Sequence, residues 1–145
     1  MRIYHYKIDL EGRLFHEGSE ITDPTVLKFF MHKLEKDSTE KYKVICQGEL
    51  NWIEAEDVPY VVQNLEFKDS HIELIFSGGY REILTEQSLE AGIHNVLYCK
   101  IRDGHFKARF NRKSYFELSR FFEENRKGHY LLNYGGKSYP ILIKT

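Results

Sequence analysis

The sequence predicts an α+β fold in which two pseudo-repeated ββαββ motifs form curved antiparallel sheets with two main helices in one compact unit. Short runs with the two-residue period of a half-buried strand recur along the chain and are separated by turn residues. Two other segments carry apolar residues at helical spacing behind a capping residue. The stretches KIDLEG (7–12) and KIRDG (100–104) each open a similar succession of these signals.

The first third of the chain predicts a hairpin, a helix and a second hairpin. Asp23 can cap the helix, and Pro24 at the first helical position loses no hydrogen bond there. The expected elements are a strand at 2–8, a turn at 9–12, a strand at 13–17, a helix from 24 to about 36, and two strands within 41–54 around Gln47-Gly48.

The middle of the chain predicts further strands and a short helix. Pro59 marks a strand entry or a sheet edge, because proline lacks the N–H that an interior strand donates. The expected elements are strands at 60–62, 65–67, 71–76 and 80–84, a turn at 77–79, and a helix from about 85 to 91.

The last third predicts the same order of elements as the first. Asn111 can cap a second helix, which we expect to carry Tyr115, Leu118, Phe121 and Phe122. The expected strands lie at 96–101, 105–110, 128–133 and 138–143, with turns at 102–104 and 135–136.

The two outer thirds can be laid over one another. Matching residues are Lys7-Ile8 with Lys100-Ile101, Gly12 with Gly104, Phe29-Phe30 with Phe121-Phe122, Tyr42 with Tyr130, and Gly48 with Gly136. We therefore expect an internal repeat at 1–54 and 96–145, bridged by 55–95, within one compact unit spanning 1–145. The alternative is convergent patterning in a small α+β protein.

Composition excludes several classes of protein. The 21 basic residues are balanced by 22 acidic ones, so the chain lacks the basic excess that nucleic-acid binding normally needs. No apolar run approaches the roughly 20 residues of a membrane helix. Cys46 and Cys99 have no zinc-ligand spacing, which favours reduced thiols and a cytoplasmic location.

Motifs of known chemistry are missing from the sequence. It contains no phosphate-binding loop, dinucleotide fingerprint, nucleophile elbow, zinc-protease motif or calcium loop. The seven histidines never fall three or four residues apart, so no pair shares a helix face as metal ligands would. We therefore expect neither a metal nor a cofactor.

Two local features have both a structural and a functional interpretation. Residues 77–79 (Ser-Gly-Gly) could offer backbone N–H groups to an anion, but a hairpin turn explains them equally well. Trp52, beside Glu49 and Asn51, could line a small-molecule cleft, although a lone strand tryptophan more often lies wholly or half in the core.

Acidic and basic residues are segregated along the chain. Residues 49–66 carry an acidic cluster, of which Glu49, Glu56 and Asp57 are the candidate site residues, whereas residues 100–113 are predominantly basic. The structural interpretation pairs Glu56 or Asp57 with Arg102 or Arg109 across the repeat.

The functional interpretation is an anion site at the start of the second helix. Cations there are disfavoured by about 0.3–1 kcal/mol because they meet the positive end of the helix dipole, and a docked anion would reverse this. The expected anion-binding residues are Arg102, Arg109, Asn111, Arg112 and Lys113.

Several of these segments resemble known families. RIYHYKIDLEGRLF, DPTVLKFFMHKL, CQGELNWIEAEDVPYVV and FSGG resemble successive blocks of uncharacterised protein family 0598 (domain of unknown function 4505). EDVPY, IRDGHFKARFNRKSYFEL and YGGKSYPI resemble the family of domain of unknown function 1285. The resemblance implies a small α+β fold with repeated motifs and a suggested signalling or regulatory role, without an established enzyme activity. The matching positions are Glu49, Asn51, Glu56, Asp57, Pro59, Arg102, Gly104, Arg109 and Arg112.

We expect a non-catalytic binding or regulatory module for a small anionic metabolite or an acidic protein segment, present as a monomer or homodimer. One alternative is an enzyme with dispersed acid/base residues, such as Glu56 or Asp57 with a histidine. Another is a structural protein-interaction module that dimerises through an exposed strand edge. We expect neither a nucleic-acid nor a membrane partner.

Overall fold

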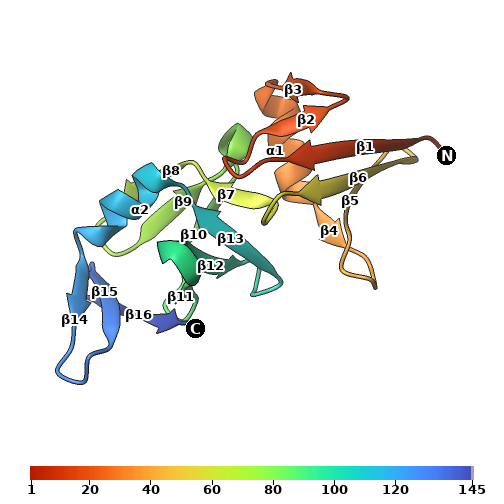
Figure 1. Cartoon of the computed structure of the whole chain (residues 1–145). Coiled ribbons are helices and arrows are strands. Elements are labelled where there is room, and N and C mark those ends of the chain that lie inside the picture. Colours follow the sequence, from red (N-terminus) through yellow and green to blue (C-terminus); the bar gives the residue numbers. More distant parts are fainter. Residues whose placement is uncertain (145) are drawn as a thin grey trace. The chain divides into compact units, whose positions relative to one another are not determined.

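The computed structural model describes residues 1–144, and its internal contacts divide them into two units. The first unit contains Met1–Val61 together with Phe76–Tyr80, and the second contains Val62–Ile75 and the chain from Arg81 onward. The described residues include two α-helices and three open sheets, which confirms a mixed α+β class (Figure 1). The expected boundaries of the repeat and the single compact unit stay predictions.

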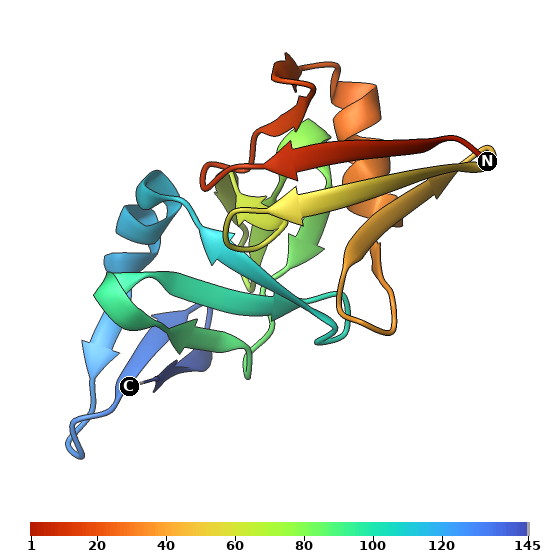
Figure 2. The same ribbon diagram turned by 45° about the vertical axis from the view of Figure 1, so that its right-hand side comes forward.

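The first unit is built on a six-stranded sheet in the order β3-β2-β1-β6-β5-β4. The long strands β1 and β6 lie side by side at its centre and run parallel, as Figure 2 shows. Its strands are β1 (Ile3–Ile8), β2 (Leu14–His16), β3 (Ser19–Ile21), β4 (Glu35–Lys36), β5 (Tyr42–Cys46) and β6 (Glu49–Ala55). The expectation of purely antiparallel sheets is therefore wrong at this central pair.

Helix α1 (Pro24–Lys33) covers one face of this sheet. The Asp23 carboxylate accepts a hydrogen bond of 2.9 Å from the Thr25 N–H and caps the helix as predicted. Phe30 is buried, and its ring meets Tyr6 of β1 edge-to-face at 5.1 Å. The helix ends three residues earlier than expected because β4 pairs with β5.

Residues 76–80 return to the first unit from the middle of the chain. The short 3₁₀ turn η1 (Ser77–Gly79) packs against α1, and the Ser77 hydroxyl donates to the Gly12 carbonyl at 3.1 Å. The Phe76 ring lies 5.5 Å from Tyr60, whose side chain is fully buried. Ser77-Gly78-Gly79 is thus a packed turn.

The second unit contains most of a seven-stranded sheet in the order β14-β15-β16-β11-β12-β13-β7 and a smaller sheet, β10-β9-β8. Strand β7 (Tyr60–Val62) carries the chain into this unit. Besides β7, the larger sheet consists of β11 (Leu89–Ala91), β12 (Leu97–Ile101), β13 (Phe106–Phe110), β14 (Phe122–Glu124), β15 (Tyr130–Tyr134) and β16 (Lys137–Ile143). The smaller one consists of β8 (Asn64–Phe67), β9 (Ile72–Ile75) and β10 (Arg81–Ile83).

Two helix predictions for this unit differ from the structure. Residues 89–91 form strand β11, because they pair with β12 on one side and with β16 on the other. Helix α2 (Arg112–Ser119) contains Tyr115 and Leu118 but ends before Phe121, and Phe122 belongs to β14. In both places sheet pairing overrides a sequence of good helix formers.

Candidate functional site

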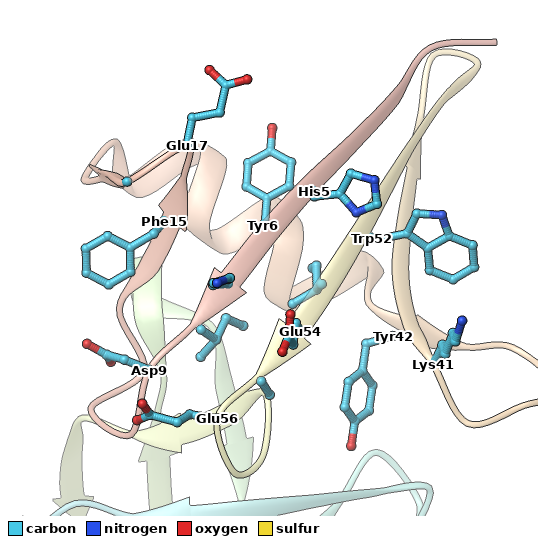
Figure 3. Close-up of a pocket in the computed structure, with 15 residues that line it drawn as sticks. His5, Tyr6, Asp9, Phe15, Glu17, Lys41, Tyr42, Trp52, Glu54 and Glu56 are labelled. Carbon is cyan, nitrogen blue, oxygen red and sulfur yellow. The ribbon is translucent and has the colours of Figure 1, made fainter.

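The face of the first sheet that is turned away from α1 forms an open groove of about 1080 Å³, which we call the groove. It is lined by residues of β1, β2 and β6 and of the segment leading into β5 (Figure 3). The side chains used in the argument below are His5, Lys7, Phe15, Lys41, Trp52 and Glu54.

Strand alternation and register place these side chains on one face. Tyr6 points toward Phe30 of α1, so His5 and Lys7 point to the opposite side of the sheet. In the parallel ladder His5 is the partner of Trp52, and Lys7 is the partner of Glu54. Lys7 is also the antiparallel partner of Phe15, so the groove runs across three strands.

Aromatic rings stand on both sides of the groove. Figure 3 shows the Trp52 ring beside His5, and Phe15 on the other side of β1. The Lys41 ammonium lies 5.9 Å from the centre of the Trp52 ring, within range of a cation–π attraction. Trp52 is half-buried and lines the groove, and its role toward a small molecule stays a prediction.

The acidic residues at one end of the groove are already engaged by the protein. Asp9 accepts hydrogen bonds from the backbone and side chain of Arg13, the latter at 2.7 Å. Burial raises the pKa of Asp9, but the hydrogen bonds outweigh this effect and lower it. The Glu56 carboxylate accepts the Leu10 N–H at 3.1 Å.

The charges at the centre of the groove are not engaged in this way. Within residues 1–144, neither Lys7 nor Glu54 has an ion-pair partner, although their backbones are paired in register. Both side chains are exposed to solvent. Among the described residues, Lys7 and Glu54 thus place a cation and an anion without ion-pair partners at the centre of the groove, which Glu17 and Lys41 also line.

A buried acidic residue of the second unit is neutralised within that unit. Glu90 of β11 is buried, and its carboxylate lies 2.6 Å from the Lys107 ammonium and 3.4 Å from that of Lys144. Burial raises the pKa of Glu90, but the two lysines outweigh this effect and lower it.

The residues predicted for an anion site at the start of α2 make contacts within the protein. Asn111 caps the helix by accepting the Ser114 N–H at 2.9 Å. Lys113 donates to the Asn64 side-chain oxygen at 2.8 Å, and the Arg112 guanidinium lies 5.9 Å from the Phe116 ring. These groups gather at the helix start, and their role toward an anion stays a prediction.

Arg102 and Arg109 lie at opposite ends of the β12–β13 hairpin. Arg102 occupies the turn, where its backbone N–H donates to Glu82 and its guanidinium lies 4.7 Å from the Phe106 ring centre. Arg109 is opposite Tyr98, near the end of β13 that leads into α2. The length of β13 therefore separates Arg102 from the helix start.

The three candidate acidic residues do not form one cluster. Glu49 begins β6 and accepts a hydrogen bond from the Tyr4 hydroxyl at 3.4 Å, whereas Glu56 follows the end of the same strand. At about 3.3 Å per residue, the strand places them roughly 23 Å apart. Asp57 lies beside Glu56 in sequence, and its pairing with an arginine of the second unit stays a prediction.

Sequence reasoning named Trp52 but missed Lys7, Phe15 and Glu54. The sequence signal for these three residues was weak, because the alternation of polar and apolar residues identified one polar face of β1 but did not show that β6 lies beside β1.

Cys46 and Cys99 are free thiols. Across the described residues 1–144, no three histidine, cysteine, aspartate or glutamate side chains converge as a metal site would require.

Comparisons with known proteins identify the fold. No protein-family model and no curated protein matches the sequence. A crystal structure of a DUF1285 family protein from Silicibacter pomeroyi DSS-3 superposes with a TM-score of 0.72 at 19% identity, over 97% of this chain and 82% of the other. A DUF1285 family protein from Shewanella baltica OS155 gives 0.64 at 17% identity, over 79% and 90%.

The resemblance of the sequence to domain of unknown function 1285 is therefore confirmed in the structure, whereas its resemblance to family 0598 stays a prediction. Neither helix described within residues 1–144 has the length and apolar character to cross a membrane. This chain has the fold of the DUF1285 family proteins.

Proposed function

We propose that this chain is a non-catalytic binding module and that its groove takes a small anionic metabolite with a flat ring. The observation that carries the proposal is Trp52, a half-buried ring on the wall of an open groove whose central lysine, Lys7, has no ion-pair partner in the described chain. Ligand sites combine apolar and aromatic walls with a few polar groups that fix orientation. The groove has this composition.

A binding role is favoured over catalysis by the way the acids near the groove are used. Asp9 and Glu56 accept backbone hydrogen bonds at the β1–β2 turn, which suits structural carboxylates. His5 is the register partner of Trp52, four residues before Glu56, so roughly 13 Å of strand lies between them. An acid and a base that act on one substrate must each reach its reacting atoms, and paired catalytic carboxyl groups are separated by at most about 9.5 Å, which is less than this spacing.

The ligand can be sought with the tryptophan that lines the site. Trp52 is the single tryptophan of the sequence, so fluorescence excited at wavelengths that the ten tyrosines do not absorb reports on the groove alone. We expect native mass spectrometry of the purified protein to give a mass excess that denaturation removes, and the released compound to change Trp52 fluorescence on titration. Lys7→Gln should weaken that titration about tenfold or more, since a charged hydrogen bond contributes about 1.5–3 kcal/mol.

The matched control is Lys43→Gln. Lys43 lies on the same sheet face, but it pairs with Glu35 at 3.9 Å and lies outside the groove. A second pair of variants, Arg109→Ala and Arg112→Ala, tests the anion site predicted at the start of α2. Equal weakening by Lys7→Gln and Lys43→Gln, or weakening by the α2 variants alone, would refute the groove as the site.

We also propose that the two units are copies of one motif. The strand orders of the two larger sheets support this. The first reads β3-β2-β1-β6-β5-β4, and the second contains β13-β12-β11-β16-β15-β14, so each strand of the first unit has a counterpart whose label is higher by ten. The parallel pairs Ile8↔Ala55 and Ala91↔Ile143 occupy matching positions. In this alignment β1 corresponds to β11, one strand earlier than in the sequence overlay.

A loop exchange tests the common motif. The Asp37 carboxylate accepts the N–H groups of residues 39 and 41, and the Asn125 side chain accepts those of residues 127 and 129. Replacing residues 37–41 by the sequence of 125–129 (NRKGH) should change the free energy of unfolding by less than about 1 kcal/mol. Surface substitutions that preserve the local hydrogen bonds have small effects on stability. A larger loss in urea denaturation would contradict the proposal.

A further inference from the structure

Two residues of opposite charge, Lys7 and Glu54, lie side by side at the centre of the groove without forming an ion pair. Lys7 and Glu54 are partners in the parallel β1–β6 ladder, so both side chains leave the same face of adjacent strands about 5 Å apart. Opposite charges at such positions commonly attract and form ion pairs. Within residues 1–144 neither side chain has an ion-pair partner.

The aromatic walls are arranged around this pair of charges. Phe15 is the antiparallel partner of Lys7, so its ring lies on β2, on the side of Lys7 that is away from Glu54. Trp52 lies two residues before Glu54 on β6, so it stands on the same face beside the anion. A flat group lying between these rings would carry its own charged groups directly over Lys7 and Glu54.

In the second unit, the residue that we align with Lys7 is Glu90, and its charge is neutralised by ion pairs. Glu90 is the β11 residue paired with Tyr98 and Leu142, as Lys7 is paired with Phe15 and Glu54. Its carboxylate is buried between two lysine ammonium groups of the same unit. The charge of Glu90 is thus neutralised within its own unit, whereas Lys7 and Glu54 have no ion-pair partner among the described residues.

We propose that the groove selects a zwitterionic ligand, one that carries a carboxylate for Lys7, a protonated amino group for Glu54 and a flat ring between Phe15 and Trp52. This inference rests on the proposed function, since it keeps the same groove and the same carboxylate on Lys7, and it differs in adding an amino group that balances the charge of the ligand. An anion without an amino group would use Lys7 and leave Glu54 unsatisfied. The amino group therefore decides specificity.

Three probes with one ring and different charges test the inference. Phenylalanine carries both charged groups, 3-phenylpropionate lacks the amino group, and 2-phenylethylamine lacks the carboxylate. Because none contains an indole, their binding can be followed by the fluorescence of Trp52 and by saturation-transfer NMR. We expect the full chain to bind phenylalanine at least tenfold more tightly than either analogue.

Charge-neutral variants assign each group to its partner. Glu54→Gln should reduce phenylalanine affinity to that of 3-phenylpropionate and leave 3-phenylpropionate unchanged. Lys7→Gln should reduce it to that of 2-phenylethylamine, and Lys43→Gln should change none of the three. Circular dichroism and unfolding midpoints establish that each variant is folded, which is expected because Lys7 and Glu54 are exposed and Lys43 is partly exposed.

The outcomes separate this inference from the proposed function. Equal binding of phenylalanine and 3-phenylpropionate, both weakened by Lys7→Gln, would overturn the zwitterionic ligand and retain the groove as an anion site. Binding of all three probes without any effect of either groove variant would overturn both. Failure of all three probes to bind at millimolar concentration would overturn both as well.

Discussion

Replacing Gly78 by alanine tests how residues 76–80 are held in the first unit. Gly78 has a φ of +72°, a left-handed conformation that glycine adopts at no steric cost. A Cβ atom there would lie 2.3 Å from the Lys28 backbone nitrogen and 2.6 Å from the Pro24 carbonyl oxygen. Both atoms belong to the first turns of α1, so no flexible side chain can move aside.

The expected loss follows from two separate costs. A left-handed alanine costs about 1–2 kcal/mol, and the stiffer unfolded chain offsets about 0.4–1 kcal/mol of it. Overpacking against backbone adds about 1–3 kcal/mol or more, because either η1 or α1 must shift. We therefore expect Gly78→Ala to lower the free energy of unfolding by about 2–4 kcal/mol.

Gly79→Ala is the matched control. Gly79 has a φ of +85°, but no heavy atom lies within 4 Å of the position of its missing Cβ. Only the conformational cost applies, so we expect a net loss below about 1.5 kcal/mol. Urea denaturation followed by Trp52 fluorescence measures both variants. Equal losses would refute the close packing of Gly78 on α1.

Three further predictions concern the second unit and the thiols. Asn111→Ala should cost about 1–2 kcal/mol in urea denaturation, because the cap is lost; unchanged stability would contradict its capping role. The hydrogen bond from Arg81 lowers the pKa of Glu66 to about 2, so stability from this pair is present above pH 4.5 and lost as pH falls toward 2. The difference in unfolding midpoint between wild type and Glu66→Gln should therefore shrink between pH 7 and pH 3, and a constant difference would contradict it. Burial raises the pKa of Cys99, so a disulfide reagent should titrate one thiol rapidly in the native chain, and Cys46→Ser should abolish that reaction.

Local signals predicted the elements whose cause is local. Asp23 and Asn111 cap helices because a short polar side chain can bond the N–H groups two or three residues ahead. The Gln47-Gly48 turn between β5 and β6 was predicted because both residues can take positive φ, which they do at 48° and 77°. These features need no information about distant residues.

Prediction failed where distant pairing decides conformation. Residues 85–91 have helical composition, yet Leu89–Ala91 form a strand because β12 and β16 both need a partner there. The ends of α1 and α2 were placed too late for the same reason, since β4 and β14 take residues that would otherwise continue each helix.

The sequence predicted only part of the candidate site. Trp52 could be named because a lone tryptophan with polar neighbours is unusual. Lys7 and Glu54 are 47 positions apart along the chain, and neither charge is remarkable by itself. Their relation arises when β1 pairs with β6 in parallel, a pairing that no local pattern encodes.

The sequence by itself determined the α+β class, the capped helix starts, the glycine turns and most strands of this protein, because each depends on interactions within a few residues. The tertiary structure decided the strand order, the parallel central pairs and the return of residues 76–80 onto α1. It also decided the groove, because burial on one sheet face and exposure on the other depend on which side α1 covers. Those contacts join residues far apart in the chain, and their energies exceed the local preferences that a sequence displays.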